Sequence, residues 1–159
     1  MVETLFQITE LFKKHKIHYC LIGGLAMMLH NGRANTVDID FYVLVEDLKD
    51  VIETLKKEKI QADQRGDYQL KAKINGIPID ILYADQYVGS DVVKRAVDKA
   101  LGNHIVRVAT PEDIIILKSI ADRTVDRRDI EELRELFKGK LDENYIQKTL
   151  LKIRKELES

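Results

Sequence analysis

Residues 22–44 read Ile-Gly-Gly-Leu-Ala-Met-Met-Leu-His-Asn-Gly-Arg-Ala-Asn-Thr-Val-Asp-Ile-Asp-Phe-Tyr-Val-Leu, and this stretch decides the fold. Gly23 and Gly24 close an apolar run and open a helical one. Asp38 and Asp40 then interrupt an otherwise apolar segment that we predict to be a strand. Because residues two apart in a strand project from the same face, these two carboxylates are expected to lie side by side.

The paired carboxylates indicate a metal site. Two adjacent carboxylates repel each other and resist desolvation unless a cation lies between them. Oxygen ligands at this spacing suit Mg²⁺, which is usually held by one or two carboxylates together with substrate phosphates. The residues of opposite phase, Val37, Ile39, Phe41 and Val43, are expected to point into a core. The stretch therefore predicts a divalent-metal site beside a phosphate-binding turn.

A third carboxylate, Asp80, stands in the apolar segment Ile-Pro-Ile-Asp-Ile-Leu-Tyr at residues 77–83. An Asn-Gly pair precedes this segment and predicts a hairpin. If the strand pairs beside the one that carries the first two aspartates, Asp80 joins them on one face. Three carboxylates can hold two metal ions about 4 Å apart, the arrangement used for in-line phosphoryl or nucleotidyl transfer. A solvent-facing Asp80 is the alternative.

Length and composition favour a globular α/β protein. The chain has 159 residues, of which 45% are hydrophobic and 33% charged, so we expect one domain. Its α/β core covers about residues 1–108, and helices over about 109–159 pack on it. The net charge of −1 provides no overall basic field for nucleic acid. We find no leader-like N-terminus and no apolar run long enough for a bilayer, and expect a cytoplasmic protein without membrane contact.

Apolar periodicity and turn signals predict the elements along the chain. Helices are expected over residues 2–14, 25–31, 46–59, 91–98, 111–121, 127–137 and 142–158. Strands are expected over residues 18–22, 37–45, 68–74, 77–83 and 104–108. Thr110 followed by Pro111 is typical of a helix start, with the threonine as N-cap.

The glycine pair, the Asp-Ile-Asp and the later aspartate resemble the signature of nucleotidyltransferases of the DNA polymerase beta superfamily. Within it, the chain is most similar to the AbiEii-type and related minimal stand-alone nucleotidyltransferases. Their pattern is Gly-Gly, then Arg-x-x-Thr-x-Asp-hydrophobic-Asp, then Thr-Pro-Glu-Asp, Lys, Ala-x-Arg, Asp and Asp. The later matching residues here are Thr110, Pro111, Glu112, Asp113, Lys118, Ala121, Arg123, Asp126 and Asp129. The resemblance implies a mixed β-sheet flanked by helices, with a helical C-terminal portion.

The resemblance also implies roles for the carboxylates and the glycines. Asp38 and Asp40 would hold two Mg²⁺ ions, and Asp80 would hold the catalytic one. Asp80 is also a candidate general base toward the acceptor hydroxyl. Gly23 and Gly24 would bring backbone N–H groups and a helix N-terminus against the triphosphate.

Three further residues are candidates for nucleotide binding by the same resemblance. Arg33 and Lys118 would contact phosphate, the arginine through its planar fork and the lysine as a point charge. Thr36 stands in the matching Arg-x-x-Thr segment. We interpret the run Asp-Arg-Arg-Asp at residues 126–129 as an ordinary charged helix start.

The implied function is Mg²⁺-dependent transfer of a nucleoside monophosphate from an NTP, with ATP as one candidate, to an acceptor hydroxyl. A tRNA 3′ end, a side chain of a partner protein and a small molecule such as an aminoglycoside all stay open as acceptors. A non-catalytic nucleotide-binding protein of the same fold, or a toxin–antitoxin partner, is the alternative, and the three intact carboxylates count against it. A metal-dependent phosphodiesterase is a further alternative, which lacks the histidines that such sites often add.

Overall fold

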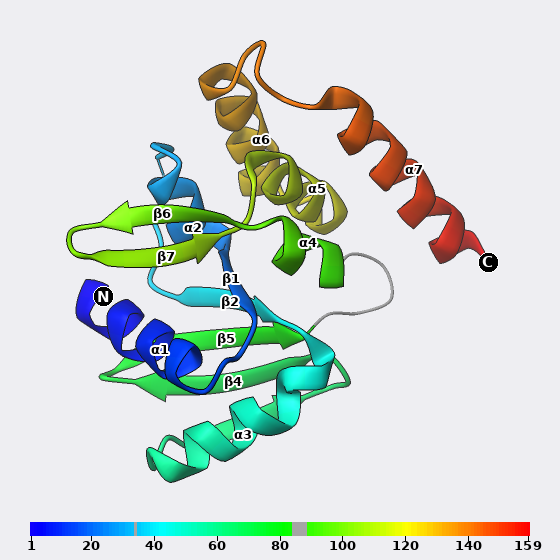
Figure 1. Cartoon of the computed structure of the whole chain (residues 1–159). Coiled ribbons are helices and arrows are strands. Elements are labelled where there is room, and N and C mark those ends of the chain that lie inside the picture. The colour runs from blue at the N-terminus through cyan, green and yellow to red at the C-terminus, as the bar shows by residue number, and fades with distance from the viewer. Residues whose placement is uncertain (34, 84–88) are drawn as a thin grey trace.

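The computed structural model describes residues 1–33, 35–83 and 89–159, and the strands within these ranges form one mixed sheet (Figure 1). The sheet order is β3-β4-β5-β2-β1-β7-β6. β1 pairs with β7 and β2 pairs with β5 in parallel, and the other neighbours are antiparallel. The strands are β1 Tyr19–Ile22, β2 Ile39–Val43, β3 Ala62–Arg65, β4 Gln69–Ile74, β5 Ile77–Tyr83, β6 Val97–Leu101 and β7 His104–Val108. The predicted mixed sheet flanked by helices is confirmed.

Helices flank this sheet and continue beyond it at the C-terminal end of the chain. In Figure 1, α5, α6 and α7 form one group that lies well apart from α1 and α3. No helix in the described ranges is both long and apolar enough to cross a bilayer. The helices are α1 Val2–Lys14, α2 Gly23–Leu29, α3 Leu48–Lys57, α4 Gly89–Arg95, α5 Pro111–Ala121, α6 Thr124–Leu136 and α7 Glu143–Glu158, with a 3-10 turn at Val45–Asp47.

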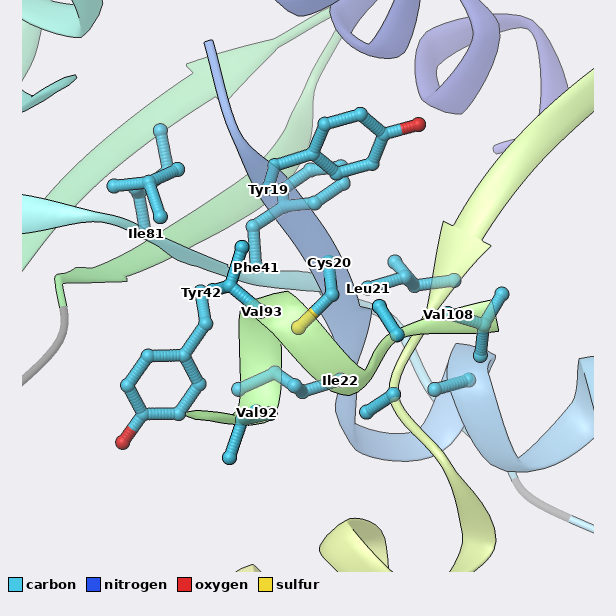
Figure 2. Close-up of a cluster of buried hydrophobic side chains, with 14 of the residues drawn as sticks. Tyr19, Cys20, Leu21, Ile22, Phe41, Tyr42, Ile81, Val92, Val93 and Val108 are labelled. Carbon is cyan, nitrogen blue, oxygen red and sulfur yellow. The ribbon is translucent and has the colours of Figure 1, made fainter. Parts of the chain in front are cut away.

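The central strands β1 and β2 are buried on both faces of the sheet. The ring of Phe12 on α1 lies 5.2 Å from the ring of Tyr19 and 5.3 Å from that of Phe41, centroid to centroid. Figure 2 shows Tyr19 and Phe41 on one side of the strands and Cys20 and Tyr42 on the other, next to α4. Asp40 lies two positions before Tyr42 in the same strand, so its side chain projects from the same face of the sheet as Tyr42, away from α1.

A polar cluster fixes α7 to the rest of the protein. The Tyr145 hydroxyl on α7 donates to Oδ1 of Asp113 on α5, at 2.6 Å. The Arg95 guanidinium of α4 lies 3.7 Å from the centroid of the Tyr145 ring and 3.4 Å from Oδ2 of Asp113. Asp113 is fully buried, and its Oδ2 also accepts from the Thr110 hydroxyl. Thr110 also caps α5 by accepting from the Asp113 N–H, as predicted.

The strand that carries the first two aspartates is shorter than predicted. Its hydrogen-bonded part begins at Ile39, so Asp38 lies just ahead of β2. Val37 is 72% exposed, so its predicted place in the core is wrong. The chain reaches the sheet only after the turn formed by Thr36 and Asp38, and alternation therefore does not extend back to Val37.

Two strands were not predicted. β3 is mostly exposed and polar, so it carries no hydrophobic pattern that would identify it. The helix predicted over residues 91–98 ends at Arg95, and β6 begins at Val97 as the edge strand of a hairpin with β7. The helix predicted to begin at residue 127 begins at Thr124. Residues 84–88, part of the connection after β5, lie outside the described residues.

Candidate active site

The three predicted carboxylates come together where β2 and β5 run side by side. Asp40 and Asp80 occupy matching positions in the parallel register of these two strands. One carboxylate oxygen from each of Asp38, Asp40 and Asp80 lies within 4.8 Å of the others. In the ranges that the structure describes, this is the one group of acidic, histidine or cysteine side chains placed to share an ion. The predicted pairing of the two strands is thereby confirmed.

The electrostatics of the cluster favour a bound cation. Burial, reinforced by the negative charges of Asp80 and Asp38, raises the pKa of Asp40 to about 7. Removing that penalty requires either a proton or a positive ion between the carboxylates. Half-buried carboxylate oxygens at this separation are the hard ligands that Mg²⁺ prefers. The donor set therefore fits the metal that the resemblance implies.

Asp80 is held by two side chains of β4. The Gln69 amide nitrogen donates to Oδ1 of Asp80 at 3.2 Å, and the Lys71 ammonium lies 3.3 Å from the same oxygen. Both contacts follow from the antiparallel pairing of β4 with β5, in which Lys71 faces Asp80. The sequence analysis did not identify either residue. The alternation of polar and apolar residues within one strand does not show which residues of a neighbouring strand will lie beside it.

Gly23 lies at the first position of α2 and directly against the carboxylate cluster. Its φ of +72° belongs to the left-handed region, which glycine adopts at little cost. A Cβ at this position would also collide with the carboxylate of Asp40. Two independent physical reasons therefore require glycine here. The structure places Gly24 next to it, lining a cavity beside Asp38.

Two cavities open on either side of Asp40, and Gly23, Asp40, Lys118 and Arg123 line both. The first has a volume of about 670 Å³, and we call it the basic cavity after its three arginines and its lysine, although carboxylates line it as well. Its further lining residues are Gly24, Arg33, Asn35, Thr36, Asp38, Val125, Arg128, Asp129 and Glu132. The second, which we call the apolar cavity, has a volume of about 500 Å³ and is also lined by Asp80, Leu82, Leu117, Ile120, Ile153 and Leu157.

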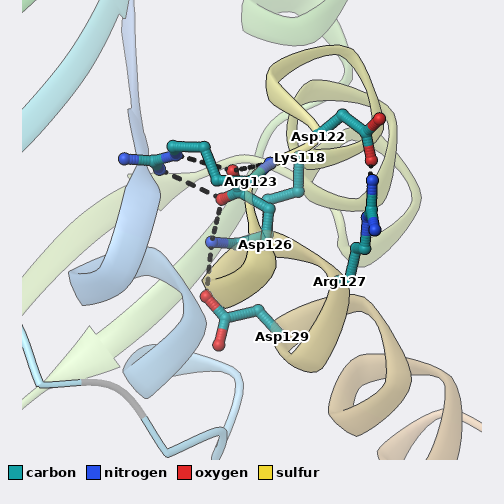
Figure 3. A network of polar contacts seen from close by, with 6 residues as sticks. All are labelled: Lys118, Asp122, Arg123, Asp126, Arg127 and Asp129. Atoms are coloured by element: carbon teal, nitrogen blue, oxygen red, sulfur yellow. Dashed lines mark hydrogen bonds and ion pairs between the residues drawn. The ribbon is translucent and has the colours of Figure 1, made fainter.

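Lys118 reaches both cavities but is already paired. Its ammonium lies 2.7 Å from Oδ2 of Asp129 and 3.6 Å from Oδ1 of Asp126 (Figure 3). Asp126 is 1% exposed and also accepts from the Arg123 guanidinium, at 2.7 and 3.0 Å. The interpretation of residues 126–129 as an ordinary helix start is therefore incomplete, because Asp126 and Asp129 neutralise cations at the site. Their spacing along α6 gave no signal of the contact with Lys118, since this lysine belongs to the preceding helix.

The other two residues predicted to bind nucleotide, Arg33 and Thr36, have different roles in the structure. Arg33 lines the basic cavity, and its backbone N–H donates to the Glu132 carboxylate on α6 at 2.6 Å. Thr36 shapes the turn before β2, because its hydroxyl contacts the backbone N–H and C=O of Asp38 at 3.3 and 3.1 Å. Arg123 and Arg128 also line the basic cavity, although the sequence analysis assigned neither a role. Arg123 did stand in the matching family pattern, which was the available signal.

Comparison with protein families identifies the chain. The family described as "Nucleotidyltransferase of unknown function (DUF6036)" matches residues 2–157. The chain belongs to this family. The family match confirms the predicted nucleotidyltransferase superfamily, which is a broader assignment than the AbiEii-type one. A comparison with curated protein sequences finds no match.

Solved structures with the fold of this nucleotidyltransferase include two enzymes that modify antibiotics. ANT(2″)-Ia, in complex with adenylyl-2″-tobramycin, is 16% identical, with 98% of each chain covered and a TM-score of 0.69. The lincosamide antibiotic adenylyltransferase LnuA, bound to lincomycin, is 18% identical over 86% of this chain and 98% of its own, with a TM-score of 0.66. An antigenic nucleotidyltransferase-like protein from Paracoccidioides brasiliensis is 18% identical over 98% and 89%, with a TM-score of 0.61. At these identities the likeness establishes the fold.

Proposed function

We propose that this nucleotidyltransferase transfers AMP from ATP to a hydroxyl group of an acceptor in a Mg²⁺-dependent reaction. The observation that carries the proposal is the approach of Asp38, Asp40 and Asp80 to within 4.8 Å of one another. Three carboxylates at this separation suit a pair of divalent ions that act on a transferring phosphoryl group. The acidic cluster has no evident structural use, since burial next to like charges disfavours the charged form of Asp40.

The proposed reaction is a single displacement at phosphorus. The acceptor oxygen forms a bond to the α-phosphorus of ATP, the bond to the bridging oxygen breaks, and pyrophosphate leaves. The acceptor proton passes to the Asp80 carboxylate, which faces the apolar cavity. Mg²⁺ held by Asp38, Asp40 and Asp80 would supply positive charge beside the reacting phosphate. The N–H groups of Gly23 and Gly24 at the start of α2 would donate to phosphate oxygens.

Structural neighbours favour a small-molecule acceptor over a macromolecule. ANT(2″)-Ia holds an adenylylated tobramycin, and LnuA is an adenylyltransferase bound to lincomycin. The net charge of −1 also supplies no overall basic field, which argues against tight binding of RNA. A tRNA end and a side chain of a toxin–antitoxin partner are the competing acceptors.

The proposal is tested with the four α-³²P-labelled NTPs, each in the presence of Mg²⁺ or EDTA. We expect Mg²⁺–ATP to raise the melting temperature, because a ligand that binds only the folded state stabilises it by about 2.7 kcal/mol at a hundred times its Kd. Label transfer is then screened against a small-alcohol library, total tRNA and proteins encoded next to the gene.

The matched variants are Asp80→Asn, in the cluster, and Asp63→Asn, on the exposed strand β3. We expect the first to abolish label transfer and the second to leave it unchanged. If none of the four NTPs raises the melting temperature with Mg²⁺, the enzymatic proposal fails.

A further inference from the structure

The three carboxylates are divided between the two cavities. Asp38 lines only the basic cavity, Asp80 lines only the apolar cavity, and Asp40 lines both. The apolar cavity is therefore the one that gives direct access to Asp80, and the basic cavity is the one that gives direct access to Asp38.

The basic cavity has the chemistry of a triphosphate site. It is lined by Arg33, Arg123 and Arg128, and by the glycine pair at the start of α2. Asp129 and Glu132 also line it, but the first is paired with the Lys118 ammonium and the second accepts from the Arg33 backbone N–H. Arginine forks and backbone N–H groups are the usual donors to phosphate oxygens. If the proposed function holds, the nucleotide occupies this cavity. The apolar cavity, on the other side of Asp40, is then the place for the acceptor.

The walls of the apolar cavity come from the sheet and from the C-terminal helices. Leu82 of β5, Leu117 and Ile120 of α5, and Ile153 and Leu157 of α7 all line it. Ile120 and Leu157 are 43% and 59% exposed, so apolar surface continues to the rim. A volume of about 500 Å³ lies within the range of small-molecule sites, roughly 300–1,000 Å³.

Apart from the carboxylates of the metal cluster, the charged groups of the described residues that line this cavity are paired with one another or with Asp129. Asp126 binds Arg123, and Lys118 is shared between Asp126 and Asp129. Asp80 is held by two side chains of β4 and, with Asp40, belongs to the metal cluster. No further carboxylate of the described chain lines the cavity to receive a cationic acceptor. Burying an unpaired ammonium group there would be costly.

We propose that the acceptor is a small, uncharged alcohol with an apolar body, which lies in the apolar cavity with its hydroxyl toward Asp80. This proposal rests on the proposed function and specifies the substrate class of the same site. The apolar body contacts Leu82, Leu117 and the Ile153–Leu157 side of α7. The hydroxyl oxygen forms the new bond to phosphorus, its proton passes to Asp80, and pyrophosphate leaves on the side of the basic cavity.

The test uses 1-octanol and 8-amino-1-octanol, two alcohols of the same length that differ in one positive charge. The full chain carries ¹³C-labelled isoleucine and leucine methyl groups, and each alcohol is titrated with Mg²⁺ present. We expect 1-octanol to shift the methyl resonances of Leu117 and Ile153 and to leave those of Ile74, at the far end of β4, unchanged. The amino alcohol should bind at least about tenfold more weakly, because its ammonium group finds no partner.

Two leucines of α7 provide the matched variants. Leu157 lines the cavity, whereas Leu151 does not, and their exposed fractions are similar at 59% and 53%. Since both side chains face solvent, aspartate at either position should leave the fold intact. We expect Leu157→Asp to weaken 1-octanol binding about fivefold and Leu151→Asp to leave it unchanged.

The outcomes separate this proposal from the one on which it rests. Equal or tighter binding of the amino alcohol, or an equal effect of the two leucine variants, would overturn the uncharged acceptor. Label transfer from ATP to tRNA or protein, with none to either alcohol, would overturn it as well. Failure of Mg²⁺–ATP to shift the Gly23 and Gly24 amide resonances would instead contradict the nucleotidyltransferase activity.

Discussion

The site has a strand side, formed by β2 and β5, and a helical side, formed by α5 and α6. The pKa values of carboxylates are shifted in opposite directions on these two sides. On β2, burial and two neighbouring carboxylates raise the pKa of Asp40 to about 7. On α6, hydrogen bonds from the Arg123 guanidinium lower the pKa of Asp126, although this side chain is almost fully buried. The helical side is neutralised by its own cations, whereas the strand side is left with unmatched negative charge. This difference supports the proposal that a positive ion binds among the carboxylates of β2 and β5.

The largest effect is expected when the unmatched charge is removed. Asp40→Asn preserves the shape of the side chain and abolishes the negative charge that would hold Mg²⁺. Nucleotidyl transfer should fall about a thousandfold, the order of loss when a charge-stabilising group leaves an active site. The metal-free protein should melt at the same temperature or slightly higher, because repulsion with Asp80 and Asp38 is relieved. An unfolded variant, in circular dichroism, would show that Asp40 is structural.

A second substitution tests how tightly the backbone approaches the carboxylates. Gly23→Ala should lower the free energy of unfolding by about 3 kcal/mol, from left-handed strain and from the collision with Asp40. Gly102→Ala is the matched control, because Gly102 has a φ of +61° with open space around it. It should cost only the strain, about 1 kcal/mol. Equal costs in urea denaturation would contradict the collision, and adding Asp40→Ala to Gly23→Ala should recover the difference.

We expect substitutions on the helical side of the site to change mainly the free energy of unfolding. Asp126→Asn leaves Arg123 without its carboxylate partner and weakens the hold on Lys118, and we expect a loss of about 2 kcal/mol. Asp122→Asn, next to it, breaks a pair with Arg127 in which both side chains are more than 60% exposed. That change should leave the melting temperature unaltered. Similar losses from the two variants would mean that burial of Asp126 does not strengthen its interactions.

The smallest effect is a dependence of stability on pH in the metal-free protein. Because the pKa of Asp40 is higher in the folded state than in the unfolded chain, the folded state binds its proton more tightly. The stability this provides is complete below the unfolded pKa and is lost as pH rises through about 7. With EDTA present, the free energy of unfolding of Asp40→Asn relative to the parent should therefore increase by about 1 kcal/mol between pH 6 and 8. A constant gap would contradict the raised pKa.

The strand side of the site was accessible from the sequence, because strand periodicity places polar residues on a face without further information. Asp40 and Asp80 interrupt apolar segments, and each has an apolar row in the opposite phase. The prediction failed where the strand ended. Val37 was extrapolated into the core, yet it lies before the first hydrogen bond of β2 and is exposed.

The helical side could not be predicted in the same way. The family resemblance predicted a phosphate contact for Lys118, but it did not identify its partners Asp126 and Asp129, which come from the next helix. Which side chains meet depends on how α5 packs against α6, and neither sequence segment encodes that geometry by itself. The apolar cavity was even less predictable from the sequence, because residues of β5, α5 and α7 together form its walls.

The cluster that joins Tyr145, Asp113 and Arg95 has a consequence for how the acceptor range could change in evolution. It anchors the first turn of α7 to α5 and α4, while Ile153 and Leu157, two and three turns further along, close the apolar cavity. Substitutions in that distal half can therefore reshape the wall of the cavity while the anchor keeps the helix in place. None of them touches Asp38, Asp40 or Asp80. Acceptor preference can diversify among relatives while the chemistry of transfer stays the same.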